Sequence, residues 1–255
     1  MSGKIVRGRK KMTLLESLRY YADYLFHSQE YEKTGDIGEQ HLYRELIALF
    51  GKKNIFRNLY LEKENGKTTE IDLLAIHSTG IYVFESKNYS GLIIGSTEER
   101  QWRQILGKKV YTFYNPILQN NMHIRALQGY LLEKYPNINY YSYIVFSIRC
   151  DLTEIETAQE RTFVLKREFL KQNLTNILQS QEPILSEKEI STLSLFFKSK
   201  ERPDETVRVQ HNKNIQEALN RCPNCNGRLV VRYNKKTNQT FHGCENFPKC
   251  RYTKS

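Results

Sequence analysis

Hydrophobic residues recur with helical spacing in the N-terminal part of the chain. Leu42, Leu46 and Phe50 fall on one face, and this pattern predicts an amphipathic helix over 36–50. The stretch 12–26 also has an apolar face with several aromatic residues. Its spacing predicts a segment that docks on the main domain or on a partner, with association to a membrane surface as the alternative.

Further along, the pattern changes to that of strands. Segments 69–76 and 81–87 are rich in Ile, Leu, Val, Tyr and Phe and are separated by four turn-forming residues, which predicts an antiparallel hairpin. Apolar side chains occupy both faces of this hairpin, so we expect a sheet that is covered on both sides. The apolar stretch 140–148 predicts another buried strand.

The second half of the chain returns to helical patterns. Helices are predicted over 115–133, 166–179 and 186–197. Asn115 and Pro116 provide an N-cap and a first helical residue, and Ser186 with Glu189 forms a capping box. The polar and charged segment 199–220 predicts a linker.

The order of these elements predicts an α/β core accompanied by a small second unit, because 255 residues exceed one average domain. The expected units are an N-terminal segment (1–30), a core (31–150), a helical extension (151–198), a linker (199–220) and a cysteine-rich module (221–255). No apolar run approaches the roughly 20 residues that a spanning helix needs. A cytoplasmic location is therefore expected.

Four of the five cysteines lie within the last 34 residues. They form two pairs separated by eighteen residues, Cys222 with Cys225 and Cys244 with Cys250. Four thiolates can hold one tetrahedral Zn²⁺, and two short apolar stretches around a polar turn separate the pairs, which predicts a zinc ribbon. The fifth cysteine, Cys150, follows an apolar run and is expected to be a buried, inert thiol.

Positive charge is concentrated in the same module. The whole chain has a formal net charge of +11, which favours a polyanionic partner, either nucleic acid or an anionic membrane. Residues 221–255 hold eight Lys or Arg against the single acidic residue Glu245. Aromatic residues alternate with these cations, at Tyr233, Phe241, Phe247 and Tyr252. Such aromatics suit stacking on unpaired bases, or else they fill the small core.

Charged residues also gather at the end of the predicted hairpin. Glu85 and Lys87 share a face because side chains alternate along a strand. A two-residue loop at 78–79 places Asp72 opposite Glu85, whereas a loop at 79–80 places it opposite Lys87. Either register brings the three charges together, and a three-residue loop separates them.

Two carboxylates at the end of a covered sheet need a compensating charge. Mg²⁺ accepts oxygen ligands, bridges to a phosphate and lowers the pKa of a bound water, while a lysine stabilises the developing charge. Glu39 falls on the apolar face of the first helix, so it is expected to reach toward a polar site, with a role in complementing the helix dipole as the alternative. This chemistry predicts phosphodiester hydrolysis, with an ordinary surface Glu and Lys ladder as the alternative.

Several short motifs in the first half of the chain occur in the order and spacing of a known family. They are Gly35–Glu39, Glu70–Asp72, Val83–Asn88, Gly91, Gly95, Trp102 and Asn115–Gln119. Residues from about 34 to 150 thereby resemble the NERD domain, the nuclease-related domain of the PD-(D/E)xK superfamily. The resemblance implies a restriction-endonuclease-like mixed sheet with flanking helices. It also implies Asp72 and Glu85 as metal ligands, Lys87 as the helper of the catalytic base, and Glu39 and Gln119 as further site residues.

The cysteine module carries a second resemblance. Its Cys-Pro-Asn-Cys opening, the strand Gly227–Val230 and the run Phe241–Cys250 resemble the C-terminal zinc ribbon of bacterial type IA DNA topoisomerases. That resemblance implies binding of DNA, mostly single-stranded.

These features together predict a Mg²⁺-dependent DNA nuclease that its ribbon delivers to DNA, with RNA as an alternative polymer. A DNA-binding adaptor with a nuclease-like core is the competing hypothesis. Two inward carboxylates beside a lysine favour the enzyme, because binding alone gives no reason to bury them. Trp102, His41 and His123 are interpreted as core or surface residues.

Overall fold

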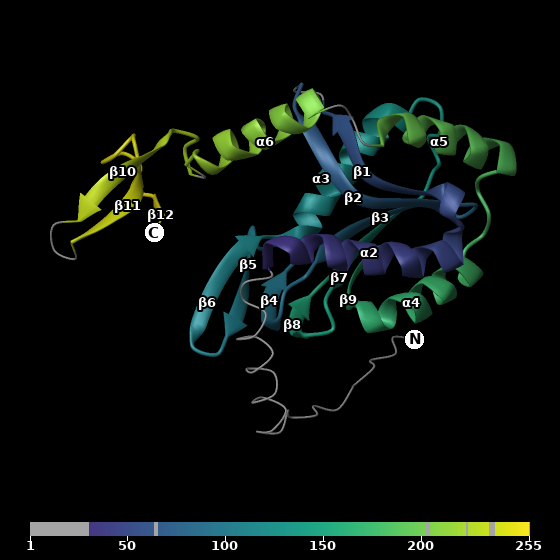
Figure 1. Cartoon of the computed structure of the whole chain (residues 1–255), viewed down its shortest axis with the longest axis horizontal. Helices are drawn as coiled ribbons and strands as arrows, with labels where there is room; N and C mark the ends of the chain where they lie inside the picture. The colour runs from purple at the N-terminus through teal and green to yellow at the C-terminus, as the bar shows by residue number, and fades with distance from the viewer. Residues whose placement is uncertain (1–30, 64–65, 202–204, 223, 235–237, 255) are drawn as a thin grey trace.

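The computed structural model describes residues 31–63, 66–201, 205–222, 224–234 and 238–254. The predicted N-terminal segment 12–26 lies outside them. The helices are α2 (Tyr31–Phe50), the 3-10 turn η1 (Lys52–Asn54), α3 (Pro116–Leu131), α4 (Arg167–Ser180), α5 (Glu187–Lys200) and α6 (Glu205–Leu219). Figure 1 shows helices on both faces of a central sheet, and a small sheet beyond α6.

The strands form three sheets. The central sheet has the order β1-β2-β3-β7-β9, with bounds Ile55–Glu62, Thr68–His77, Gly80–Lys87, Tyr140–Phe146 and Thr162–Lys166. The second has the order β6-β5-β4-β8, with bounds Lys109–Tyr114, Gln101–Leu106, Gly91–Ser96 and Cys150–Glu156. The third is β10 (Leu229–Asn234), β11 (Gln239–Cys244) and β12 (Thr253–Lys254). Parallel and antiparallel pairs coexist in the first two sheets, so the predicted mixed α/β architecture is confirmed.

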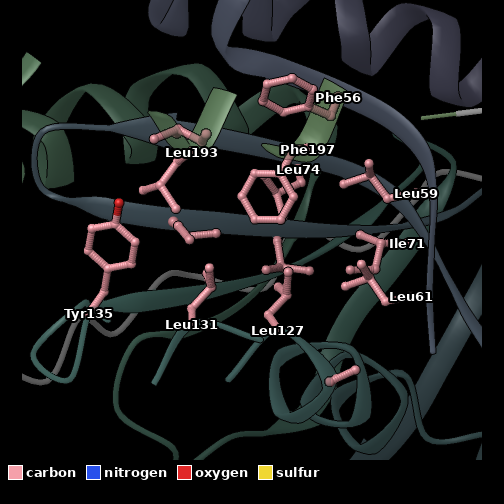
Figure 2. Close-up of a cluster of buried hydrophobic side chains, with 14 of the residues drawn as sticks. Phe56, Leu59, Leu61, Ile71, Leu74, Leu127, Leu131, Tyr135, Leu193 and Phe197 are labelled. Atoms are coloured by element: carbon pink, nitrogen blue, oxygen red, sulfur yellow. The ribbon is translucent and has the colours of Figure 1, made fainter. Parts of the chain in front are cut away.

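Helices α3 and α5 cover one face of the central sheet. Leu127 of α3 and Phe197 of α5 are fully buried against Leu74 and Val83 of the strands. Figure 2 shows this cluster, in which side chains from both helices and from the strands gather. Burial of each such large apolar side chain contributes roughly 1.5–3 kcal/mol.

The other face of the sheet is covered by α2 and α4. Leu42 and Leu46 of α2 and Leu170 of α4 pack against Tyr82 and Phe84. Because successive side chains of a strand point to opposite faces, β3 contributes Val83 to one cluster and its neighbours to the other. The predicted coverage on both sides is therefore confirmed.

The hairpin of β2 and β3 adopts one of the two predicted registers. His77 pairs with Gly80, so Ser78 and Thr79 form the two-residue loop. Gly80 has φ 143°, and a Cβ there would lie 2.4 Å from the carbonyl oxygen of Asn139. Glycine at this turn therefore lets the start of β3 lie directly against the loop that precedes β7, its neighbour in the sheet.

Several elements differ from the predictions. Helix α2 begins earlier, at Tyr31, and the segment 199–220, predicted as a linker, contains the helix α6. In α6, His211 is buried and its Nδ1 lies 2.9 Å from Oγ1 of Thr68. The polar composition concealed this helix because the contact that docks it is itself polar. Within the described residues, no helix is both long and apolar enough to cross a membrane.

Candidate functional site

Charged and polar side chains from β3 and α3 converge on Glu85. Lys87 Nζ donates to Glu85 Oε1 at 2.6 Å and to Gln119 Oε1 at 3.1 Å. Gln119 Nε2 donates to the same Glu85 oxygen at 2.8 Å. Glu85, Lys87 and Gln119 thus form a closed triangle of hydrogen bonds, and Glu85 itself is only 2% exposed.

The start of α3 places Gln119 at the site. Asn115 caps the helix, since its Oδ1 accepts from the backbone N–H of Ile117 at 2.8 Å, and Pro116 follows as the first residue. The Asn115 side chain also donates to the carbonyl oxygen of Glu99 at 2.7 Å. One turn further, Asn120 Nδ2 donates to the Val83 carbonyl at 3.0 Å, which holds α3 against β3.

His123 also belongs to this site, which the sequence interpretation missed. It is buried, its Nε2 lies 3.2 Å from Glu85 Oε2, and its Nδ1 lies 2.8 Å from Thr69 Oγ1. Its interpretation as a core residue is confirmed by its burial, but that interpretation did not include the contact with Glu85. Its position four residues after Gln119 was the available signal, because residues i and i+4 share a helix face.

Asp72 stands beside Glu85, one position beyond the pair formed by Leu73 and Phe84. Its Oδ2 accepts from the backbone N–H of Ser86 at 3.0 Å. Burial, then the negative charges of Glu85 and Glu39, hold the pKa of Asp72 well above its ordinary value. The influence of Glu39 on this pKa shows that α2 brings a third carboxylate to the site.

Glu85 and Lys87 stabilise each other's charged forms. Burial acts to raise the pKa of Glu85, but the charge of Lys87 and the hydrogen bond from His123 outweigh it, and the pKa is lowered. Burial acts to lower the pKa of Lys87, but the charge of Glu85 outweighs it, and the pKa is raised. The pair is therefore satisfied, whereas Asp72 retains an unfavourable negative charge.

The oxygen donors of this site have the chemistry of ligands for a hard divalent cation, but among the described residues only the four cysteines lie close enough together to form a metal-holding cluster. Glu39, Asp72 and Glu85 supply carboxylates, the ligands that Mg²⁺ accepts, and Lys87 compensates one of their charges. A bound cation would remove the repulsion that raises the pKa of Asp72. The structure thus brings all five predicted site residues, Gln119 included, into one neighbourhood.

The four cysteines of the third sheet form a separate cluster. Sγ atoms of Cys222 and Cys250 are 3.5 Å apart, those of Cys225 and Cys244 are 3.3 Å apart, and all four lie within 4.8 Å of one another. Zn–S bonds of about 2.3 Å in a tetrahedron separate the sulfurs by roughly 3.8 Å. The geometry therefore fits structural Zn²⁺, as the spacing predicted.

Local hydrogen bonds favour the thiolate state of Cys225, whereas burial raises the pKa of Cys244 to about 12. The backbone N–H of Gly227 and the side chain of Asn246 lower the pKa of Cys225 to about 6. Asn246 Nδ2 lies 3.4 Å from the Cys225 sulfur. Donors of this kind around the ligands orient them and make the site selective for metal. In contrast, Cys150 is buried and burial raises its pKa to about 12, so the prediction of a buried, inert thiol is confirmed.

A groove of about 480 Å³ lies on the surface of the cysteine module. It is lined by Arg232, Tyr233, Phe241, Phe247, Arg251 and Tyr252. Tyr233 and Phe247 are 55% and 59% exposed, and the Arg232 guanidinium lies 5.6 Å from the centre of the Phe247 ring. Exposed rings beside cations suit stacking on bases and contact with phosphates, whereas the more buried Phe241 and Tyr252 contribute to the small core.

Two family models match the two sites. Residues 34–147 match the nuclease-related domain, a range that contains Glu39, Asp72, Glu85, Lys87 and Gln119. Residues 220–255 match the topoisomerase DNA binding C4 zinc finger, which contains all four clustered cysteines. No solved structure matches the chain significantly.

Individual relatives divide in the same way. An uncharacterised protein of Bacillus anthracis is 34% identical over 132 residues, which is 51% of this chain and 61% of the relative. DNA topoisomerase 1 of Pyrococcus horikoshii is 31% identical over 99 residues, 39% of this chain and 11% of the relative. DNA topoisomerase 1 of Pyrococcus furiosus is 51% identical over 35 residues, which is 14% of this chain and 3% of the relative. The chain thus spans less than two thirds of each of these relatives. Residues 34–147 are thus similar to the nuclease-related domain, and residues 220–255 are similar to the topoisomerase-type C4 zinc finger.

Proposed function

We propose that this chain is a metal-dependent nuclease that hydrolyses phosphodiester bonds in DNA and holds DNA with its zinc finger. The observation that carries the proposal is the charge imbalance at the end of β2 and β3. Three carboxylates, Glu39, Asp72 and Glu85, lie near one lysine, which is bonded to Glu85, and burial together with the charges of Glu85 and Glu39 raises the pKa of Asp72. Sites that await a divalent cation show this imbalance, whereas a purely structural ion pair has no use for it.

The proposed roles follow from the contacts. Asp72 and Glu85 would hold Mg²⁺, which supplies Lewis acidity and a bound water of lowered pKa. Lys87 has three N–H donors and uses two of them on Glu85 and Gln119, so one is free to reach a phosphate oxygen. Gln119 orients Lys87 and Glu85, because it contacts both. His123 fixes the second oxygen of Glu85.

DNA is the proposed substrate because of the zinc finger. The matched model is described as DNA binding, two of the relatives are DNA topoisomerases, and the module is strongly basic. The exposed rings of Tyr233 and Phe247 favour unpaired bases, which stack on aromatics without regard to sequence. Single-stranded or forked DNA is therefore the preferred form in this proposal.

The test is cleavage by the full chain with Mg²⁺ or Mn²⁺ on single-stranded, duplex and forked DNA, with RNA in parallel. Asp72→Asn and Glu85→Gln should each abolish cleavage while leaving DNA binding intact, since the zinc finger carries most of the positive excess. Lys87→Ala should retain metal binding and lose about 100-fold or more in turnover, the scale of one lost charge partner. Equal cleavage by wild type and Asp72→Asn would show that the site is assigned wrongly.

A non-catalytic adaptor is the second candidate, and one observation favours it. Both oxygens of Glu85 already have partners, Oε1 in Lys87 and Gln119 and Oε2 in His123. Metal binding at Glu85 must therefore displace Lys87 or Gln119. If wild type binds DNA but cuts none of the tested polymers with either metal, the adaptor is the correct function.

A further inference from the structure

Strands β5 and β6 form a hairpin that extends from the second sheet (Figure 1). All of its charged residues are positive. Residues 100–114 include four cations, Arg100, Arg103, Lys108 and Lys109, and no acidic residue. The side chains of Arg103, Lys108 and Lys109 are exposed. In the described part of the chain, none of these three forms an ion pair. Their charge is available to a partner.

The two faces of the hairpin differ in kind. Trp102 is fully buried and its Nε1 donates to the carbonyl oxygen of Ser96 at 2.8 Å, so its face fixes the hairpin to the domain. Arg103 pairs with Thr112, and Gln101 pairs with Tyr114. Because side chains alternate, these four residues share the opposite face. There the Tyr114 ring is 39% exposed, beside an exposed cation and two polar groups.

The hairpin leads directly into the candidate site. Tyr114 precedes Asn115, the N-cap of α3, and Gln119 follows on the first turn of that helix. Five residues span at most about 18 Å even when fully extended. This equals about five steps of a nucleic-acid strand at roughly 3.4 Å per nucleotide. A strand whose phosphate lies at Glu85 and Lys87 therefore passes within reach of the Tyr114 end of the hairpin, and the turn at Lys109 lies at most about 18 Å farther along β6.

We infer that this face of the β5–β6 hairpin, with Gln101, Arg103, Thr112 and Tyr114, binds a nucleic-acid strand beside the carboxylate site. The turn adds the exposed cations Lys108 and Lys109, of which Lys109 pairs with Leu106 and so belongs to the Trp102 side of the strand. This binding surface is separate from the zinc finger, and the inference rests on the proposed function. Lysines also protect edge strands against pairing. That role accounts for Lys109 on the edge strand β6 but not for Arg103, because β5 lies between β4 and β6.

Neutralisation of the hairpin tests the inference in the zinc-loaded full chain. The variant combines Arg103→Gln, Lys108→Gln and Lys109→Gln. A control that removes the same charge from exposed positions elsewhere combines Lys53→Gln, Lys171→Gln and Lys188→Gln. Fluorescence anisotropy with single-stranded DNA should show tenfold or greater loss of affinity for the hairpin variant. Its slope of log K against log salt should shrink by about 2, since three phosphate contacts at roughly 0.7 each are removed.

Substitution of Tyr114 provides an independent measurement. Tyr114→Ala should weaken binding about tenfold with an unchanged salt slope, because stacking involves no counterion release, and Tyr114→Phe should bind as wild type. Equal affinities and salt slopes for the hairpin variant and the control variant would overturn the inference. In that case, binding and cleavage of DNA by wild type would still support the proposed function. Absence of DNA binding by wild type would instead remove the proposed function. If polyglutamate binds as tightly as DNA and depends equally on Tyr114, the partner is an acidic peptide and the inference is wrong.

Discussion

Asp72 and Glu85 are neighbours across one hairpin, yet their surroundings shift their pKa values in opposite directions. Glu85 has Lys87, Gln119 and His123 as partners, whereas Asp72 has one backbone N–H, from Ser86. Burial penalises both carboxylates, and only the partners of Glu85 overcome that penalty. Two such groups should respond differently to loss of charge, because the carboxylate of Glu85 is paired with a cation and that of Asp72 is not.

Asp72→Asn should stabilise the metal-free protein at neutral pH. Because the pKa of Asp72 is raised in the folded state, the folded protein holds the Asp72 proton more tightly than the unfolded chain does. The free energy of unfolding therefore falls as pH rises from the ordinary pKa of 3.8 through the raised pKa of the folded state. Asparagine removes this loss and still accepts from Ser86. Thermal melts in chelator at pH 7 should show a gain of a few degrees, since about 1 kcal/mol shifts the midpoint by roughly 2–4 °C. The gain should vanish in acid, and a lower midpoint at pH 7 contradicts the assignment.

Glu85→Gln should have the opposite effect. It removes the hydrogen-bonded counter-ion of the largely buried Lys87 and leaves only the weaker influence of the Asp72 charge, and breaking a buried ion pair in this way destabilises a fold by about 3–5 kcal/mol. The pKa of Glu85 is lowered in the folded state, so the stability that its ionised form contributes is present above 4.5, the ordinary value, and is lost as pH falls through the folded pKa. Urea denaturation of wild type and variant from pH 7 to pH 4 should show the difference shrinking. A constant difference argues against the ion pair.

The sequence was sufficient to predict most of this site. Strand alternation and the short loop placed Asp72, Glu85 and Lys87 together without any tertiary information. Whether Asp72 lay opposite Glu85 or Lys87 depended on which residues form the loop, and the pattern leaves that open. The contact of His123 with Glu85 depends on the rotation of α3 about its axis, which Asn120 fixes through Val83. Periodicity alone does not specify such a rotation.

At the scale of secondary-structure elements, the buried strands were predicted from the sequence and the more exposed strands were missed. β3 and β7 are almost entirely buried and β2 is mostly buried, so their apolar runs are long and clear. β6 and β8 are largely exposed and β5 is half-exposed, and such strands near polar turns resemble loops in sequence. The capping box of α5 was found because its signal is local, whereas α6 contacts the core through polar residues such as His211.

The contact of Gly95 in β4 with Trp102 in β5 should be sensitive to one added methyl group. A Cβ at Gly95 would lie 2.3 Å from the Trp102 ring, so Gly95→Ala must displace the indole or the strand. Overpacking of this kind costs about 1–3 kcal/mol. Gly129→Ala is the matched control, because nothing lies within 4 Å of its added Cβ. Being inside α3, it should stabilise by about 0.5–1 kcal/mol. Chemical denaturation of the two variants checks both signs, and two equal changes would contradict the packing described for the hairpin.

At the scale of the whole molecule, the core and the cysteine module should unfold independently of each other. Cys244→Ser removes one of four ligands, and a module as small as 221–255 cannot fold without its metal. The core has its own hydrophobic clusters, so it should keep its melting temperature. Metal analysis should give one Zn²⁺ per wild-type chain and none in the variant. Loss of the core transition together with the zinc would show that the two units fold as one.

Helix α6 connects the core to the zinc finger, and its contact with the core sets how far the chain then runs before the finger begins. His211 contacts Thr68 at the start of β2, and Thr69 contacts His123 at the site. From His211 to the end of the helix at Leu219 the rise is about 12 Å. The helical stretch between His211 and the zinc finger therefore spans about four nucleotides of one strand at roughly 3.4 Å each, in addition to the separation of His211 from the carboxylates. Cleavage products mapped from a DNA end captured by the finger should accordingly begin at one minimum length, and insertion of a helical turn after His211 should lengthen it.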